Sequence, residues 1–433
     1  MSKARIVALE ILQEVLDRGR PLDRVLAEHP SVPAVPDRDQ AFLRHLVITS
    51  LRHCGEIDAL LAKMMKKPLA ANQRELRAIL RLGAAQILFM SVPPHAAVGE
   101  TVSLVRGQIT PMKGLVNAVL RRLDRERDAL LAGLDRARAN TPGWLWESWA
   151  TAYGRRTARD IAEAQLQEPP LDLTVKTDPE GWAKRLGARV LPTGSLRLPP
   201  GSGDITKLEG FAEGAWWVQD AAAALPARLL GRLDGLRVAD LCAAPGGKTA
   251  QLAGAGAQVV AVEKDETRLA LLKENLARLD LQAECLVADA ADWRPDGVLG
   301  GPLDAILLDA PCTATGTIRR HPDIAWLRRP ADPGKLAKLQ DRLLKQAAAL
   351  LEPGAHLVYA VCSLQPEEGP ERINALLAGD RGLVRKPLEP DEVGGLSQLI
   401  TRDGDLRTLP CHLAEAGGMD GFYAARLTRV RDA

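Results

Sequence analysis

Apolar residues recur at helical spacing through the first third of the chain. The clearest stripe follows the i, i+3, i+4, i+7, i+8 pattern that places side chains on one face of a helix, at Ala8, Ile11, Leu12, Val15 and Leu16. Two further stripes repeat it, at Leu76, Ile79, Leu80, Ile87 and Leu88 and at Val116, Val119, Leu120 and Leu123. Because no strand-like alternation interrupts them, the pattern predicts an all-α bundle over residues 1–138.

The pattern changes near residue 140. Residues 141–143 read Thr-Pro-Gly, a combination that breaks helices. A helix with three tryptophans follows, and we expect it to be anchored in a core by Trp144, Trp146 and Trp149. Residues 171–176 then alternate like a short strand, and residues 199–203 form a loop rich in proline and glycine. These features predict a small α+β connecting unit over residues 139–228.

From residue 229 onward, short apolar runs alternate with helical segments. The runs predict strands at 237–241, 258–262, 285–288, 305–308 and 357–361. The intervening segments 265–279 and 335–351 have helical character. Strands that alternate with helices predict a doubly wound parallel sheet, so residues 229–433 are expected to form a Rossmann-like α/β domain. Ligands of such sheets bind beyond the carboxyl ends of the strands.

The composition of the chain limits the kinds of binding site and the cellular compartment that we expect. The chain of 433 residues has a formal net charge of only +2, so a nucleic-acid surface would have to be a local patch. Six cysteines are spread without a C-x-x-C pair, which predicts neither a metal site nor a disulfide framework, and points to a reducing compartment. The chain shows no signal peptide and no apolar run of about 18 residues. We therefore expect a cytoplasmic protein with no membrane partner.

The first predicted strand of the α/β domain ends in a glycine turn, Gly246-Gly247, where backbone can approach a ligand closely. The surrounding string, residues 240–249, nearly spells the P-loop G-x-x-x-x-G-K-T, and Asp309 would then end a Walker B strand. A P-loop NTPase is therefore the rival interpretation. Cys242 stands where the P-loop needs its first glycine, and Pro245 removes an N–H that a phosphate cradle would use.

Acidic residues end the next two strands. Glu263 follows the second strand, 23 positions after Asp240, where a carboxylate can accept hydrogen bonds from ribose hydroxyls. Asp289 follows the third strand, where its side chain could reach an adenine, although a lone aspartate there is more often a helix cap. The series favours a nucleoside cofactor without a polyphosphate over ATP.

Two cysteines follow the fourth and fifth strands. Cys312 comes three residues after Asp309, and Cys362 comes directly after Val361. Both would lie on the ligand-binding edge of a parallel sheet, so they could converge although 50 positions separate them. Cys54, Cys285 and Cys411 show no such context and are interpreted as small apolar residues. The residue types alone leave open which of the two thiols reacts.

These segments resemble the bacterial RNA (cytosine-5)-methyltransferases of the Sun/NOL1/NOP2 class. The resemblance rests on residues 240–249, 309–316, 319–324 and 362–368, with Val218-Gln219-Asp220, and residues 116–122 resemble the NusB-like domain of that class. It implies an N-terminal NusB-like bundle and a C-terminal class I methyltransferase. It further implies methyl transfer from S-adenosylmethionine to C5 of a cytidine in small-subunit (16S) rRNA, by a monomer that acts on RNA and not on DNA.

The resemblance also assigns roles to residues. It implies a nucleophilic thiolate at Cys362, which would add to C6 of cytosine and make C5 reactive, and a second thiol at Cys312 that helps to release the product. Asp309 would contact both the cofactor and the target cytosine. The implied cofactor-binding residues are Cys242, Ala243, Ala244, Pro245, Gly246, Gly247, Lys248, Glu263, Asp289 and Asp309. One departure from the family stands beside the nucleophile, where Val361 replaces the usual threonine.

Two groups of basic residues are candidates for RNA contacts. The arginines directly after the fourth-strand motif are expected to contact the RNA backbone, and they are Arg319, Arg320, Arg328 and Arg329. A second group on the last long helix of the bundle is interpreted mainly as a solvated face, and it comprises Lys113, Arg121, Arg122, Arg125 and Arg127. Other functions that stay open are the same chemistry on tRNA or another RNA, a DNA methyltransferase, and a non-catalytic RNA-binding scaffold.

Overall fold

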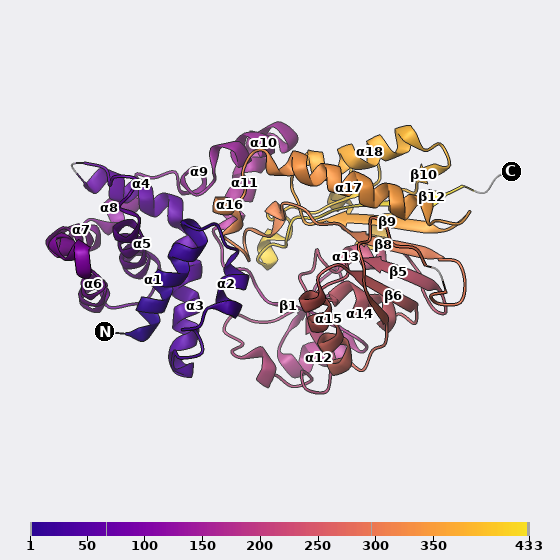
Figure 1. Cartoon of the computed structure of the whole chain (residues 1–433), viewed down its shortest axis with the longest axis horizontal. Coiled ribbons are helices and arrows are strands. Elements are labelled where there is room, and N and C mark those ends of the chain that lie inside the picture. The colour runs from indigo at the N-terminus through magenta and orange to yellow at the C-terminus, as the bar shows by residue number, and fades with distance from the viewer. Residues whose placement is uncertain (1, 66, 296, 431–433) are drawn as a thin grey trace. The chain divides into compact units, whose positions relative to one another are not determined.

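The computed structural model describes residues 2–65, 67–295 and 297–430. The chain divides into two compact units (Figure 1). The helical unit comprises Met1–Glu168 and Ile318–Pro330, and the α/β unit comprises Pro169–Thr317 and Ala331–Ala433. The units do not follow the predicted boundaries, because a segment from the middle of the α/β sequence belongs to the helical unit.

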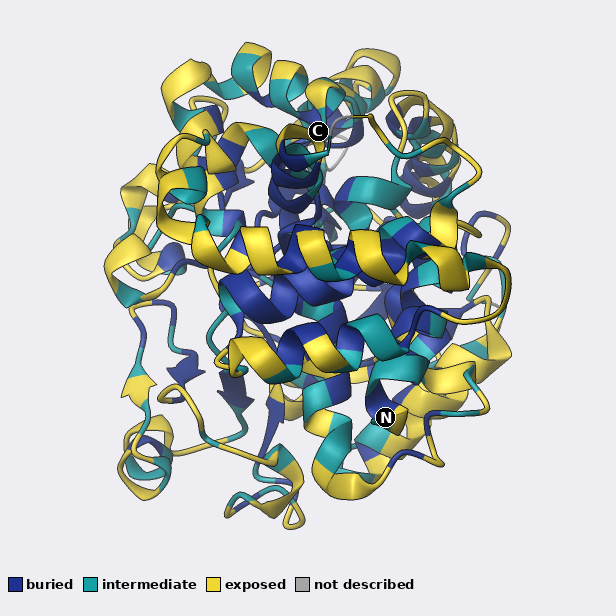
Figure 2. Ribbon diagram, turned by 90° about the vertical axis from the view of Figure 1, so that its left-hand side faces the viewer, coloured by how far each residue is buried: buried dark blue, intermediate teal, exposed yellow. Residues whose placement is uncertain are grey.

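The helical unit is built from amphipathic helices, and those within residues 3–125 surround one core. Its helices are α1 (Lys3–Leu16), α2 (Leu22–Glu28), α3 (Asp37–Arg52), α4 (Cys54–Met64), α5 (Arg74–Phe89), α6 (Pro94–Ser103), α7 (Lys113–Arg125), α8 (Arg127–Ala132), α9 (Arg136–Ala139), α10 (Gly143–Tyr153), α11 (Arg155–Gln165) and α16 (Ile324–Leu327). The three predicted apolar stripes lie in its core, where all their residues but the half-buried Leu16 are buried. Helices near the viewer in Figure 2 are exposed on their outer side and buried on their inner side. Of the three tryptophans in α10, only Trp149 is fully buried.

The 318–330 segment is held by hydrogen bonds to the bundle. Asp323 Oδ2 accepts from the backbone N–H of Leu22 at 3.0 Å, which satisfies a donor at the first turn of α2. The indole Nε1 of Trp326 donates to the carbonyl of Leu51 at 2.8 Å. Arg52 donates to the carbonyl of Arg319 at 3.1 Å. The segment that follows the Cys312 motif is therefore an integral part of the helical unit.

The α/β unit begins with a small antiparallel sheet. Its strands are β1 (Asp172–Val175), β2 (Arg189–Val190), β3 (Leu196–Arg197) and β4 (Trp216–Val218), in the order β2-β3-β1-β4, with α12 (Pro179–Leu186) beside them. Leu173, Leu196 and Trp216 form its core. The α+β character predicted for this region is therefore present, but α10 and α11 lie in the helical unit.

The main sheet has the order β10-β12-β9-β8-β5-β6-β7, with β11 paired to β12. Its strands are β5 (Arg237–Leu241), β6 (Gln258–Glu263), β7 (Glu284–Val287), β8 (Ala305–Asp309), β9 (His356–Val361), β10 (Leu383–Arg385), β11 (Leu406–Arg407) and β12 (Tyr423–Arg429). The five predicted strands, β5 to β9, are parallel. The predicted parallel arrangement is confirmed for these five strands, and β12, which the sequence did not predict, pairs antiparallel to both β9 and β10.

Helices cover both faces of this sheet. α17 (Asp332–Ala349) and α18 (Pro370–Gly379) lie on one face, and α14 (Gly247–Gly254) and α15 (Glu266–Arg278) lie on the other (Figure 1). The short α13 (Leu225–Arg228) completes the second face. Leu343 and Leu344 of α17 pack against sheet residues, as do Leu269 and Leu272 of α15. Among the helices of the described residues, none is both long and apolar enough to cross a bilayer.

Candidate active site

The carboxyl ends of the parallel strands place the predicted residues along one edge of the sheet. In register, Leu241 of β5 pairs with Leu308 of β8, and Asp309 pairs with Ala360 of β9. On the other side of β5, Glu263 of β6 pairs with Val287 of β7. Parallel strands in register end at the same edge. The loops that follow them therefore converge, and the edge gathers an acidic group and two thiols.

The glycine loop after β5 turns sharply into α14. Cys242 has a φ of +64° and Gly246 has a φ of +99°, a region that favours glycine. A Cβ on Gly246 would lie 2.8 Å from the Cγ of Leu272, so a side chain there would collide with α15.

Asp240 is fully buried before this turn, and its Oδ2 accepts from the Thr249 hydroxyl at 2.6 Å. Burial raises the pKa of Asp240 to about 7.

The groups that a P-loop would use on phosphate have protein partners. The Lys248 ammonium donates to Asp309 at 2.7 Å, and the Thr249 hydroxyl donates to Asp240. Burial lowers the pKa of Lys248, but the charge of Asp309 and its hydrogen bond outweigh burial and raise the pKa above its usual value. In a P-loop the lysine contacts phosphate and the hydroxyl contacts Mg²⁺. The internal pairing of both groups disfavours the NTPase interpretation.

Glu263 and Asp289 flank the glycine loop. The Glu263 carboxylate is nearly buried and accepts from the backbone N–H of Ala244 at 3.3 Å and of Asp265 at 3.0 Å. Asp289 is one-third exposed, pairs with Lys264 at 2.9 Å and accepts from the N–H of Ala291 at 3.0 Å. The hydrogen bond from Lys264 lowers the pKa of Asp289. Both side chains are thus held in place beside the loop by hydrogen bonds.

The side chains of Cys312 and Cys362, the two candidate thiols, are in contact. The Sγ atoms of Cys312 and Cys362 lie 3.4 Å apart. Contact with Cys362, reinforced by burial, raises the pKa of the Cys312 thiol well above its usual value. The Cys312 thiol therefore stays protonated, and its S–H can donate to the sulfur of Cys362.

The other cysteines with a resolved pKa shift are unsuited to nucleophilic chemistry. Burial raises the pKa of Cys54 to about 12, and it also raises the pKa of Cys242 and Cys285. These three thiols stay protonated near neutral pH. Cys242 thus lines the glycine loop as a neutral side chain.

A buried acid near the thiols had no predicted role. Glu368 ends the segment 362–368 on which the family resemblance partly rests, but no pattern in the sequence predicted that its side chain would be buried. In the structure Glu368 is fully buried in the 3₁₀ helix η4 (Pro366–Glu368) and accepts hydrogen bonds from both cysteine loops. The only available signal was an acidic residue close after a candidate nucleophile.

The predicted arginine contacts are corrected at one position. Arg319 is 1% exposed, and burial removes its side chain from the surface, so the expected contact with the RNA backbone was wrong there. Arg320 and Arg328 are half-buried and Arg329 is exposed, so their contacts with RNA stay a prediction. On α7, Arg122 and Arg125 pair with Glu126, as expected for a solvated helix face.

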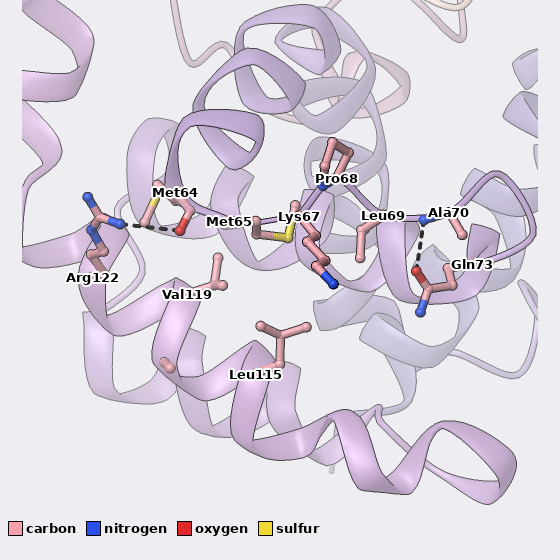
Figure 3. A pocket seen from close by; sticks show the side chains of 11 residues that line it. Met64, Met65, Lys67, Pro68, Leu69, Ala70, Gln73, Leu115, Val119 and Arg122 are labelled. Carbon is pink, nitrogen blue, oxygen red and sulfur yellow. Dashed lines mark hydrogen bonds between the residues drawn. The ribbon is translucent and has the colours of Figure 1, made fainter.

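The helical unit contains a separate hollow of about 680 Å³ between the end of α4 and the face of α7 (Figure 3). Met64, Met65 and Leu69 line one side, and Leu115 and Val119 line the other. This hollow is predominantly apolar and contains none of the predicted catalytic or cofactor-binding residues, although Arg122 of the basic group on α7 lines it. Nothing in the structure shows what covers it.

The Rossmann-like sheet with an acid-lined glycine loop, joined to a helical unit, defines a class I methyltransferase with a NusB-like domain. Family comparison matches the NusB family over residues 2–125 and the 16S rRNA methyltransferase RsmB/F family over residues 227–428. The chain belongs to this RsmB/F family. It is 39% identical over 447 residues to the ribosomal RNA small subunit methyltransferase B of Salmonella arizonae, with 98% of each chain covered.

Solved structures share the fold. A methyltransferase homolog protein from Pyrococcus horikoshii is 28% identical with a TM-score of 0.54, covering 70% of this chain and 98% of its own. The structure of NSun6 from Pyrococcus horikoshii with SFG is 20% identical with a TM-score of 0.56, covering 67% of this chain and 99% of its own. At that identity the second similarity supports the fold alone.

Proposed function

We propose that the protein transfers a methyl group from S-adenosylmethionine to C5 of a cytidine in small-subunit (16S) rRNA, acting as a monomer in the cytoplasm. The observation that supports this chemistry best is the pair of thiols 3.4 Å apart at the carboxyl edge of the sheet. One thiol serves as the nucleophile and its neighbour assists release. The substrate follows from relatives that are named ribosomal RNA small subunit methyltransferase B.

The residues at the glycine loop fit S-adenosylmethionine. When bound, this cofactor supplies an electrophilic methyl group. The Glu263 carboxylate suits the ribose hydroxyls, Asp289 suits the adenine, and the tight turn through Gly246 permits close approach of the backbone. The Oδ1 atom of Asp240 is buried and has no hydrogen-bond partner within the described residues, an arrangement that a cationic ligand nearby would stabilise.

The protein's own groups account for the handling of cytosine. The Cys362 thiolate adds to C6, which makes C5 enamine-like and able to accept the methyl group. The C5 proton is then lost and Cys362 is eliminated. Cys312 is 3.4 Å from the leaving sulfur and assists this release. Lys248 holds Asp309 at 2.7 Å, and in this proposal Asp309 contacts the target cytosine.

Bisulfite sequencing of rRNA tests this function directly. Cells that lack the gene should lose one methylated cytosine in 16S rRNA, and the intact gene should restore it while a Cys362→Ala variant should not. Incubation of the protein with labelled S-adenosylmethionine and either rRNA or tRNA identifies the substrate. Transfer to tRNA alone would replace the rRNA assignment. A failure of transfer to any RNA, including partly assembled subunits, would favour a binding scaffold.

A further inference from the structure

The Glu368 carboxylate receives hydrogen bonds from four donors. Its Oε1 accepts from the backbone N–H of Thr313 at 2.8 Å and from Gln340 Nε2 at 3.2 Å. Its Oε2 accepts from the Ser363 hydroxyl at 2.5 Å and from the Thr313 hydroxyl. The Glu368 backbone is also fixed, because its carbonyl accepts from the Tyr359 hydroxyl at 2.6 Å. Multiple bonds to one buried carboxylate determine its position and the positions of its donors.

These donors belong to the two cysteine loops. Thr313 directly follows Cys312, and Ser363 directly follows Cys362. Gln340 extends the network, because its Nε2 also donates to the carbonyl of Pro311 at 2.9 Å. The residues on either side of Cys312 are therefore both connected to Glu368, Thr313 directly and Pro311 through Gln340. Glu368 also holds Ser363, which follows Cys362. The loops also meet through the N–H of Gly316 and the carbonyl of Cys362, at 3.0 Å.

We propose that Glu368 is a positioning residue that fixes the distance between the sulfurs of Cys312 and Cys362. The inference rests on the proposed function for its catalytic meaning, but the geometry itself can be measured without methyl transfer. Glu368 acts on the reaction through the two loops. Its loss should therefore slow the chemical steps and leave the binding of RNA largely unchanged.

Two replacements separate positioning from folding. Glu368→Gln keeps the volume and can still accept from the Thr313 N–H, while its amide can donate to a hydroxyl oxygen. Glu368→Ala leaves the donors of both loops without their acceptor. Glu371→Gln is the matched control, because Glu371 is an exposed acid in the first turn of α18. Circular dichroism and thermal unfolding establish which variants are folded.

The rate at which Cys312 and Cys362 form a disulfide reports how far apart their sulfur atoms lie, and it can be measured on the full chain without RNA or cofactor. Diamide accepts two hydrogens from a pair of thiols, forming a disulfide and the corresponding hydrazine, and peptide mass mapping identifies the Cys312–Cys362 link. We expect Glu371→Gln to match the wild type, Glu368→Ala to link at least about tenfold more slowly, and Glu368→Gln to be intermediate. In methyl transfer, Glu368→Ala should lower kcat by about 10²-fold with KM for RNA nearly constant, the effect of roughly 1 Å of misplacement.

The outcomes distinguish this inference from the proposed function. Wild-type rates of trapping and transfer in folded Glu368→Ala would overturn the positioning role. If that variant does not fold, unchanged trapping and kcat in Glu368→Gln would overturn it instead. If trapping depends on Glu368 but the wild type methylates no RNA, the positioning role stands and the proposed function falls.

Discussion

Cys312 and Cys362 are 50 positions apart in the chain, yet their sulfur atoms lie 3.4 Å apart. The contact arises because β8 and β9 are parallel neighbours, so the residues beyond their carboxyl ends meet at one edge. Contact with Cys362 and burial raise the pKa of Cys312. The residue types alone left open which thiol attacks, and the proposal of Cys362 as the nucleophile rests on the resemblance to the family.

Single cysteine replacements should give opposite effects. Cys362→Ala should abolish methyl transfer and covalent capture of RNA, because the attacking thiolate is absent. Cys312→Ala should accumulate a covalent protein–RNA adduct, because release slows while attack continues. Denaturing gels with labelled RNA measure the adduct, and Cys285→Ala is the control. An adduct that required Cys312 and not Cys362 would exchange the two roles.

Glu263→Ala should weaken the binding of S-adenosylmethionine. The carboxylate orients the glycine loop through the N–H of Ala244 and is placed for the ribose hydroxyls. Loss of charged hydrogen bonds of this kind costs about 2 kcal/mol, or roughly thirtyfold in Kd. Isothermal titration calorimetry measures the change, and Glu263→Asp should retain most of the affinity. Unchanged affinity in Glu263→Ala, or binding of Mg-ATP in preference to S-adenosylmethionine, would contradict the assignment.

Asp240 should make stability depend on pH. Burial raises the pKa of Asp240 from 3.8 to about 7, so the folded state holds this proton more tightly than the unfolded state. The stability it contributes is fully present below the unfolded pKa and is lost as pH rises through about 7. Asp240→Asn cannot ionise, so its melting temperature relative to the wild type should rise between about pH 4 and about pH 7 and change little at higher pH. A difference that does not vary with pH would contradict this account.

Features with a local signature were predictable from the sequence, and features that depend on distant contacts were not. Strands β5 to β9 could be predicted because each is an apolar run between helical segments, and their ends gave the site residues. The strand β10 follows α18 but has only three residues, and β12 follows an irregular stretch of 3₁₀ helices, so neither strand had a clear local signature. The membership of residues 318–330 in the helical unit depends on hydrogen bonds to residues about 300 positions away, such as Leu22. Burial of Glu368 likewise results only from the convergence of two loops.

Trp326→Ala should destabilise the helical unit. The indole donates to the carbonyl of Leu51 and packs against the core of the bundle. Loss of a half-buried tryptophan should cost about 2 kcal/mol, below the usual cost for a fully buried one. Hydrogen exchange of the full chain should show weaker protection in α3 and α4, while Trp326→Phe should recover the packing without the hydrogen bond. Equal protection in Trp326→Ala and the wild type would show that the segment is not held by this residue.

Arginines after the Cys312 motif should contribute to the salt dependence of RNA binding. Arg328 is half-buried and Arg329 is exposed, whereas Arg319 is buried and is left unchanged in this test. Each phosphate contact that is lost from a single strand should reduce the slope of log K against log salt by about 0.7. We expect Arg328→Gln and Arg329→Gln each to weaken binding and flatten the slope, and Arg125→Gln on α7 to leave it nearly unchanged. Binding measured by fluorescence anisotropy over a range of salt concentrations gives the slope. If the slopes of Arg328→Gln and Arg329→Gln both equal that of the wild type, these arginines do not contact the RNA backbone.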